Sequence, residues 1–316
     1  MSSNVDEHVH VLVSDSIRRV SAESRDMVLD PHTHAWGPPS EAHPWVNGPI
    51  VDMVDGFDVH TVYTADRLLA DMDRTGVDEA VVVGYPICDW TDNWYTRRVA
   101  AERDRLYGIV MLDPFVDDAA AHLRECMAVE GVLGFRLGVA CPSDRMWETF
   151  DPEVSWLREA IEETEFWEAA VETDAVVQLL PDHRQLDQVF ALVEVYPELT
   201  YLVDHFAHAG PETPTDGGTF ARFSELAEYD GVAVKVSEMV HASDGEFPYA
   251  DMHDHVRWLV EEFGRERVVW GSDYPNVSDE ATYGESLRWV DHVEGLSDRD
   301  REWLTGRAFR EHVGLG

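Results

Sequence analysis

Short apolar runs rich in β-branched residues alternate along this chain with stretches of helical periodicity. Runs of four to eight apolar residues bounded by turn-forming residues are typical of buried strands. Two of the amphipathic stretches, 64–76 and 117–131, are predicted helices that end at Gly76 and Gly131. The eight predicted strands are residues 27–30, 79–84, 106–112, 132–137, 175–180, 199–204, 232–237 and 267–272.

The alternation of strands and helices predicts an α/β fold. Successive strand–helix–strand units make right-handed parallel crossovers, and eight of them close naturally into a (β/α)₈ TIM barrel. A doubly wound open sheet is the rival, but no Gly-x-Gly-x-x-Gly motif follows an early strand. We predict an N-terminal extension over residues 1–26 and a barrel domain over 27–316. The long segment 35–64 after strand 1 is predicted to cover the barrel mouth.

The composition and net charge exclude some classes of binding partner. Asp and Glu number 63 against 24 Lys and Arg, for a net charge of −39. Such a surface repels nucleic acid and anionic membranes, so we expect neither as a partner, and we expect a small-molecule substrate. No apolar stretch approaches the roughly 20 residues that span a bilayer.

The use of lysine and cysteine indicates where the protein works. Lys235 is the only lysine in the chain. An acidic surface almost free of lysine is tolerable in molar salt, where the Debye length falls to about 3 Å. The three cysteines, Cys88, Cys126 and Cys141, are widely spaced and form no Cys-x-x-Cys pair, which indicates reduced thiols. We therefore hypothesise a cytoplasmic protein of a halophile.

Three His-x-His pairs occur, and their local periodicity separates them. Side chains two residues apart share one face of a strand but diverge by about 200° on a helix. His253 and His255 lie in a helical pattern, so we expect solvated histidines that share no cation. His8 and His10 precede the barrel and are expected at the surface.

His32 and His34 directly follow the first predicted strand, at the end of a barrel strand where active sites are built. Two neutral imidazoles on one face suit Zn²⁺ or a similar divalent ion. Buried polar side chains in barrel strands are unfavourable unless they are hydrogen-bonded or have a function. Several of them at one rim of the barrel therefore predict an active site. Those at the other strands are Arg136, His205, Lys235 and Asp273. For Lys235, a structural ion pair with a neighbouring carboxylate is the alternative.

Several sequence blocks together resemble the amidohydrolase superfamily. The similarity is greatest to the amidohydrolase-related (amidohydrolase 2) branch, which holds sugar-acid lactonases, 2-pyrone-4,6-dicarboxylate lactonase and nonoxidative decarboxylases. It extends over residues 27 to about 312. The blocks are DPHTHAWG (30–37), HPW (43–45), GVDEAVVVG (76–84), DNWY (92–95), GFRLG (134–138), LVDHFAH (202–208), VKVSEM (234–239) and VVWGSDYP (268–275).

This resemblance implies a metal-assisted hydrolase that opens a lactone of a sugar acid or a dicarboxylate. One divalent ion, Zn or Mn, would be bound, with a metal-free site as the alternative. The implied metal ligands are His32, His34, His205 and Asp273. The implied catalytic residues are Asp273, His205 and Arg136, and Arg136 is also the implied substrate anchor. Further predicted substrate contacts are Trp36 and Trp45 in the segment 35–64, Tyr274, and the single lysine Lys235.

One departure from the family pattern concerns strand five. Metal-containing members end that strand with a histidine, whereas His183 follows Pro181 here, so its place among the ligands stays open. The same departure favours the lactonase-like branch over a nonoxidative decarboxylase. A non-catalytic barrel is the remaining alternative. The sequence leaves the oligomeric state open, with a homodimer as one option.

Overall fold

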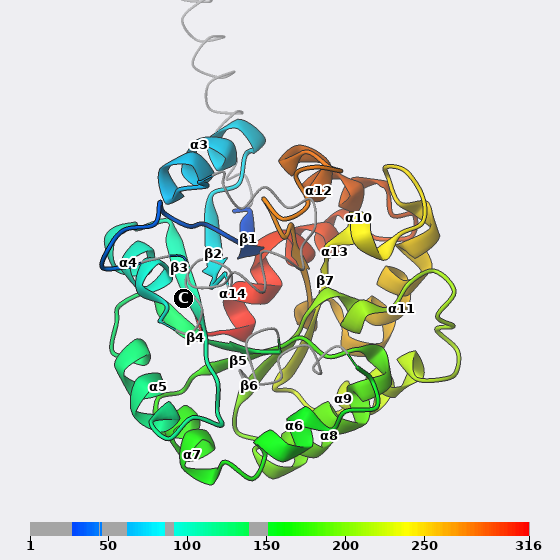
Figure 1. Cartoon of the computed structure of the whole chain (residues 1–316). Coiled ribbons are helices and arrows are strands. Elements are labelled where there is room, and N and C mark those ends of the chain that lie inside the picture. Colours follow the sequence, from blue (N-terminus) through cyan, green and yellow to red (C-terminus); the bar gives the residue numbers. More distant parts are fainter. Residues whose placement is uncertain (1–26, 44, 46–61, 86–91, 139–150, 316) are drawn as a thin grey trace, which may run out of the picture.

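The computed structural model describes residues 27–43, 45, 62–85, 92–138 and 151–315. Its strands form one parallel eight-stranded sheet in sequential order, which curls into a barrel with the helices outside it (Figure 1). The predicted TIM barrel is therefore confirmed. The strands are β1 (Leu29–Thr33), β2 (Glu79–Val83), β3 (Leu106–Met111), β4 (Val132–Leu137), β5 (Val176–Leu179), β6 (Thr200–Val203), β7 (Val232–Ser237) and β8 (Val268–Gly271).

Strand β1 differs most from its predicted bounds, because it runs on past Pro31 to Thr33. Proline lacks a backbone N–H and usually ends a ladder. Here the pairing with β2 shifts register between Asp30 and Thr33, and the ladder resumes at Thr33 opposite Val82. This irregularity accommodates the proline and places His32 inside the strand.

The helices cover the outside of the barrel (Figure 1). Gly76 is the C-cap of α3 as predicted, and Thr64 is its N-cap. By contrast, α5 ends at Met127, so the predicted end at Gly131 is wrong. Gly131, with a φ of 82°, lies in the turn that enters β4. The helices are α3 (Ala65–Thr75), α4 (Trp94–Glu102), α5 (Ala119–Met127), α6 (Trp156–Ala160), α7 (Thr164–Glu172), α8 (Leu186–Val195), α9 (Phe223–Leu226), α10 (Met239–Ala242), α11 (His253–Phe263), α12 (Tyr283–Arg288), α13 (Asp298–Glu302) and α14 (Ala308–His312).

Two apolar clusters support the barrel. The larger packs the outer faces of the strands against the helices. The smaller joins side chains from several strands, among them Leu29, Ile109 and Val269, to Trp303 and Phe309 near the C-terminus. Several other buried side chains of the strands are polar, among them His32, Arg136 and Lys235. The apolar interior thus supports a polar layer from beneath.

A seam between β1 and β8 closes the ring. Thr33 and Tyr274 form a parallel bridge. The backbone N–H of Asp273 donates to His32 O at 2.9 Å, and the N–H of His34 donates to Tyr274 O at 2.9 Å. The chain therefore brings residues more than two hundred positions apart into direct contact at the barrel rim.

The helix α11 contradicts one prediction from the sequence. His253 and His255 are buried, not solvated. Each ring instead bonds through Nε2 to a backbone carbonyl, that of Pro248 for His253 and that of Thr213 for His255, both at 2.8 Å. The two rings thus bond separate carbonyls, and the acceptors that hold them come from loops that periodicity cannot place.

Other predictions fall wholly or partly outside the described residues. His8, His10, Cys88, Cys141 and residues 1–26 lie there, so the domain boundary at residue 27 stays a prediction. Cys126 is a buried free thiol. The cover formed by 35–64 also stays a prediction, because residues 44 and 46–61 are not described. Within the described residues, no helix has the length and apolarity needed to cross a membrane.

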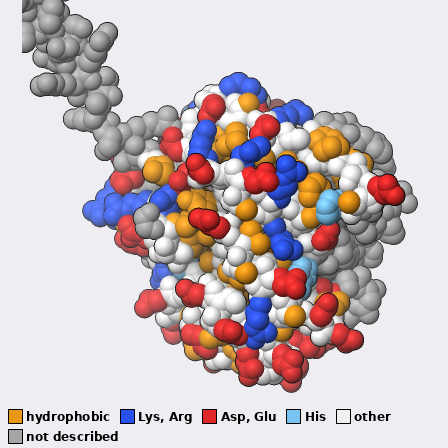
Figure 2. Space-filling model, turned by 90° about the vertical axis from the view of Figure 1, so that its left-hand side faces the viewer, with side chains coloured by type: hydrophobic (Ala, Val, Ile, Leu, Met, Phe, Trp, Pro, Cys, Tyr) orange, Lys and Arg blue, Asp and Glu red, His pale blue; other side chains and the backbone are white. Residues whose placement is uncertain are grey.

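Carboxylates are spread over the surface, with arginines between them (Figure 2). Several arginines pair with carboxylates of a neighbouring element, as Arg124 does with Glu172 at 2.7 Å and Arg158 with Asp187 at 2.8 Å. Exposed pairs of this kind each contribute at most about 1 kcal/mol, and salt screens them. The large excess of acidic groups is therefore not neutralised by internal pairing.

The close approach of β4 and β5 at Gly134 gives a test of the barrel register. A Cβ at this position would strike the backbone of Val176, 2.6 Å from its N atom. The backbone of Val176 is held by the hydrogen bonds between β4 and β5 and cannot move away from the added methyl group. We therefore expect Gly134→Ala to lower the free energy of unfolding by about 3 kcal/mol. Denaturant unfolding measures this change. Gly217→Ala, where nothing lies within 4 Å, is the control, and equal stability of the two variants would contradict the register.

Candidate active site

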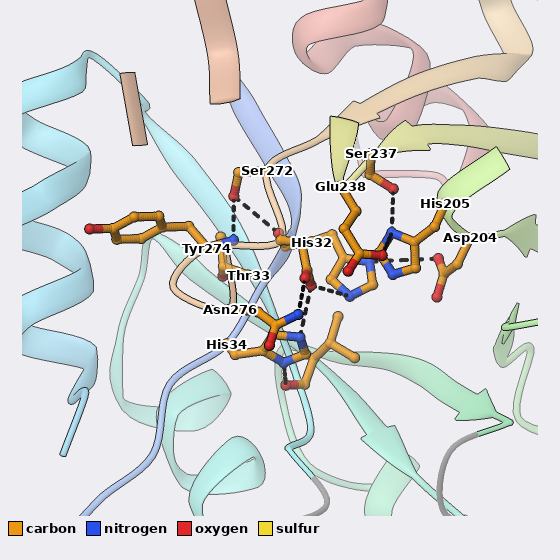
Figure 3. Close-up of polar contacts among 12 residues, drawn as sticks. His32, Thr33, His34, Asp204, His205, Ser237, Glu238, Ser272, Tyr274 and Asn276 are labelled. Atoms are coloured by element: carbon orange, nitrogen blue, oxygen red, sulfur yellow. Dashed lines mark hydrogen bonds and ion pairs between the residues drawn. The ribbon is translucent and has the colours of Figure 1, made fainter. Parts of the chain in front are cut away.

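A cluster of buried histidines and carboxylates lies at the carboxyl ends of the strands (Figure 3). His32 lies at the centre of the cluster, between Asp273 on one side and Asp204 on the other. Among the residues that the structure describes, two groups of three side chains have ligand atoms within 4.8 Å of one another, and both include His32. They are His32, His34 and Asp273 in one group and His32, Asp204 and His205 in the other.

In the first group, two ring nitrogens converge on one carboxylate oxygen. The Nε2 atoms of His34 and His32 lie 3.0 Å and 3.4 Å from Asp273 Oδ1. His34 Nδ1 lies 2.9 Å from Val83 O, an acceptor only, so Nδ1 carries a proton and donates it. His34 Nε2 is thereby free to act as a ligand. A point surrounded by two imidazole nitrogens and a carboxylate oxygen favours a proton or a metal cation.

His32 provides an independent reason to place a ligand here. Its ring is fully buried, yet neither Nδ1 nor Nε2 makes a hydrogen bond within the described structure. Buried polar atoms are nearly always satisfied, and exceptions often mark an ion or water site. Burial, followed by the charge of Lys235, lowers the pKa of His32 to about 3. The neutral imidazole is the form that binds a metal, so these residues can hold one.

Asp273 is held in place from both sides. Its Oδ1 faces the two histidines, and its Oδ2 accepts a hydrogen bond from Asn276 Nδ2 at 2.6 Å. Burial acts to raise the pKa of Asp273, but His34 and then His32 outweigh it and hold that pKa below the usual value. The carboxylate therefore stays ionised and can accept a proton.

Asp204 lies on the other side of His32. Its Oδ1 is 3.6 Å from His32 Nδ1, and its Oδ2 accepts from Arg136 Nε at 2.9 Å and Gln178 Nε2 at 2.8 Å. Burial acts to raise the pKa of Asp204, but Lys235, His32 and Arg136 hold it well below the usual range. Asp204 is thus an ionised acceptor that faces the Nδ1 side of His32.

Lys235 lies entirely inside the protein, with none of its side chain exposed. Its Nζ donates to Gln178 Oε1 at 2.7 Å and to Pro31 O at 2.9 Å, and lies 3.4 Å from Asp204 Oδ1. Burial lowers the pKa of Lys235 to about 8, against the opposing charge of Asp204. These contacts favour the structural ion pair, and the contact with substrate stays a prediction.

His205 makes hydrogen bonds through both ring nitrogens. Its Nε2 lies 3.2 Å from Arg136 Nη2, and its Nδ1 lies 2.9 Å from Ser237 Oγ. Arginine can only donate, so Nε2 accepts and Nδ1 carries the proton. Burial, followed by His32, holds the pKa of His205 well below its usual value. The lone pair of His205 is therefore already engaged, which makes the first group the better candidate for a metal.

The structure places the other predicted site residues in different surroundings. His183 belongs to neither metal group of the described residues, and its Nδ1 lies 2.5 Å from Thr219 Oγ1. Tyr274 stacks on Tyr283 at 4.8 Å, and its ring points away from the histidine cluster (Figure 3). Trp45 Nε1 donates to Gly37 O at 3.0 Å.

Trp36 is separated from the histidine cluster by one aromatic side chain, Tyr85. Its ring stacks on Tyr85 with 4.8 Å between centroids, and the Tyr85 ring lies 4.9 Å from that of His34. Trp36 is buried, with 3% of its surface exposed. The contacts of Trp36 and Trp45 with a substrate stay predictions.

Three polar residues at the site were not singled out from the sequence: Gln178, Glu238 and Asn276. Gln178 interrupts the apolar strand β5, and a lone amide in a buried strand is a usable signal, because it must be hydrogen-bonded. Asn276 and Glu238 lie in loops after strands, where polar residues are common. Only their contacts in three dimensions distinguish them.

The family model of the amidohydrolases matches residues 5–308. The chain belongs to the amidohydrolase family. It is 25% identical over 272 residues to an L-fucono-1,5-lactonase of Burkholderia ambifaria, a match that covers 86% of this chain and 88% of that protein.

Solved structures of other proteins share the fold. One assigned as a 2-pyrone-4,6-dicarboxylic acid hydrolase, from Pseudomonas putida, is 22% identical with a TM-score of 0.73, over 92% of this chain and 98% of that one. A zinc-bound amidohydrolase of Burkholderia multivorans is 20% identical with a TM-score of 0.68, over 92% and 100%. A 2,6-dihydroxybenzoate decarboxylase from Rhizobium is 15% identical with a TM-score of 0.62, over 92% and 99%.

Metal titration of two histidine variants tests which group holds the ion. We expect His34→Ala to weaken Zn²⁺ binding by more than the roughly 10- to 100-fold lost when a residue that only orients a ligand is removed. Isothermal titration calorimetry on metal-stripped protein measures the affinity. His183→Ala, which removes a histidine outside both groups, should bind Zn²⁺ like the wild type. Equal losses in both variants would contradict this assignment.

Proposed function

We propose that this protein hydrolyses a lactone, the cyclic ester of a sugar acid or of a dicarboxylate, with the help of one divalent metal ion, Zn or Mn. The observation that carries the proposal is the convergence of His32 Nε2 and His34 Nε2 on Asp273 Oδ1. Membership of the amidohydrolase family supports it, as does the similarity to an enzyme named as an L-fucono-1,5-lactonase.

The residues fit such an ion. His32 and His34 would bind it through Nε2, with Asp273 as the carboxylate ligand. A bound divalent ion polarises an ester carbonyl and makes water more acidic. Asp204 would accept the Nδ1 proton of His32 and fix the orientation of its ring, since carboxylates commonly hold metal-binding histidines in this way. Two nitrogens and an oxygen are acceptable to both Zn²⁺ and Mn²⁺.

Asp273 would also transfer the proton. An ionised carboxylate can take a proton from the attacking water and return it to the alkoxide that leaves when the ring opens. Asn276 holds Oδ2, so Oδ1 is directed at the reacting groups.

Arg136 would bind the polar part of the substrate, and His205, whose Nε2 accepts from Arg136 Nη2, would help to position the guanidinium. Asp204 fixes the Arg136 guanidinium, which is 5% exposed, and a fixed guanidinium can form directed pairs with an ester or carboxylate oxygen. If no metal is bound, His32 Nε2 would instead donate a hydrogen bond to the carbonyl oxygen. His34 and His205 carry their protons on Nδ1, where Val83 O and Ser237 Oγ accept them. Metal analysis of protein purified without added ions, with activity measured before and after chelation, separates these two mechanisms.

Nonoxidative decarboxylation is the second candidate, because a decarboxylase shares the fold. The position of His183 argues against it. In the family pattern described above, the fully liganded site needs a histidine at the end of strand five, whereas His183 hydrogen-bonds Thr219 here. Proton release from a lactone without carbon dioxide would support hydrolysis, and release of carbon dioxide from an aromatic acid would support the rival.

The protein is also proposed to work in the cytoplasm at high salt, because its net charge is −39 with a single lysine. The carboxylates spread over the face in Figure 2 should repel one another in dilute buffer. We expect molar KCl to be needed for a full circular-dichroism signal and full activity. A protein that is stable and active in dilute buffer would contradict the proposal.

Replacement of the proposed proton acceptor tests the hydrolase directly. We expect Asp273→Asn to lower kcat by about 10²- to 10⁴-fold, because the amide cannot accept the proton. Proton release from L-fucono-1,5-lactone at high salt with added Zn²⁺ measures the rate. Asp279→Asn, at an exposed position, is the matched control. Turnover by Asp273→Asn at the wild-type rate would point to a different site, and no turnover by the wild type would point to a non-catalytic barrel.

A further inference from the structure

Glu238 has a backbone conformation that glutamate rarely adopts. It directly follows β7 and has φ 57° and ψ 36°, in the left-handed region. Outside glycine, asparagine and aspartate this conformation is unfavourable by roughly 1 to 2 kcal/mol. Strain of this kind persists where the surroundings impose it, and it concentrates at functional sites. The strained residue lies at the rim that carries the histidine cluster (Figure 3).

The contacts of Glu238 fix one carboxylate oxygen and direct the other towards the site. Its Oε1 lies 2.6 Å from His241 Nδ1, and its Oε2 lies 3.6 Å from His205 Nδ1. His241 is held from its other side, with Nε2 3.4 Å from Glu280 Oε1. The Glu238 side chain is 18% exposed, so it is not sealed from a ligand at the barrel rim. Burial raises the pKa of Glu238, and the hydrogen bond with His241 opposes that rise.

The charges around Glu238 are unfavourable to an anionic group on the substrate. In the part of the chain that the structure describes, the two cations that contact the cluster, Arg136 and Lys235, both pair with Asp204. A substrate carboxylate placed beside Glu238 would meet a like charge, which is costly at a partly buried position. A hydroxyl group placed there could donate a hydrogen bond to a carboxylate oxygen, one of the stronger kinds.

We propose that Glu238 is a specificity-determining residue whose Oε2 accepts a hydrogen bond from a ring hydroxyl of the substrate. Glu238 thereby selects lactones of neutral, polyhydroxylated sugars over lactones that carry carboxylates. This inference rests on the proposed lactonase activity and chooses between its two substrate classes. It also explains why the chain keeps a strained glutamate at a position whose backbone suits glycine.

The test compares two substrates in three variants. Wild type, Glu238→Gln and Glu238→Gly are assayed with L-fucono-1,5-lactone and with 2-pyrone-4,6-dicarboxylate, at high salt with added Zn²⁺. We expect wild type to prefer the sugar lactone. Both variants should lose about 10- to 100-fold in kcat/KM for it, because a hydrogen bond to a charged acceptor is removed. In both variants kcat/KM for 2-pyrone-4,6-dicarboxylate should stay the same or rise.

Two features separate recognition from a structural role. Glycine suits the backbone at this position, so Glu238→Gly should remain folded with wild-type Zn²⁺ content even if Glu238→Gln does not. Glu280→Gln is the matched control, because it removes the same charge from the outer side of His241 and should leave the substrate ratio unchanged.

The outcomes also separate this inference from the function on which it rests. Hydrolysis of neither lactone by wild type would overturn the lactonase proposal and the inference together. Wild-type preference for the dicarboxylate, or an unchanged substrate ratio in both Glu238 variants, would overturn the inference alone. A shift of the ratio in Glu280→Gln equal to that in Glu238→Gln would also overturn it, since the effect would then be one of general charge.

Discussion

Two backbone hydrogen bonds at the seam of the barrel hold the candidate site together. Asp273 N donates to His32 O, and His34 N donates to Tyr274 O. They fix the end of the last strand against the end of the first, so that Asp273 Oδ1 meets two imidazoles from a distant part of the sequence. Because strands in a closed barrel cannot slide independently, the seam determines the relative position of these side chains. The proposed chemistry depends on that closure.

A buried ionic layer supports the histidines from below. Asp204 pairs with both Arg136 and Lys235, and Gln178 bridges the aspartate and the lysine. Charges removed from water are stable only when paired and hydrogen-bonded, and removal of one partner typically destabilises a protein by about 3 to 5 kcal/mol. Three protein oxygens surround a single nitrogen of Lys235, an arrangement that suits a compact ammonium better than a planar guanidinium. This geometry gives a physical reason for one lysine in a chain that otherwise uses arginine.

The sequence was sufficient for the fold and for four of the residues that meet at the rim. Eight apolar runs and their intervening helical patterns predicted the barrel, and the barrel placed His32, His34, His205 and Asp273 at one rim. Errors arose where a distant contact overrides local pattern. Strand β1 continues past Pro31 because β2 pairs with it again at Thr33. His255 is buried because a carbonyl 42 residues away accepts its hydrogen bond.

The sequence also could not predict the separate roles of the histidines. Arg136 occupies the lone pair of His205, while neither nitrogen of His32 has a hydrogen-bond partner among the described residues. Glu238 follows a strand like many loop residues, and only its positive φ and its approach to His205 set it apart. The contacts of His205 with Arg136 and Glu238 join the ends of β4, β6 and β7. The local sequence pattern does not predict contacts between such distant segments.

Anomalous X-ray scattering at the zinc edge, from crystals of the protein soaked with Zn²⁺, tests the central claim most directly. The seam and the ring orientations predict one strong peak about 2.0 to 2.2 Å from His32 Nε2, His34 Nε2 and a carboxylate oxygen of Asp273. A peak centred on Asp204 and His205, or no peak at the barrel rim, would contradict this account of the metal site.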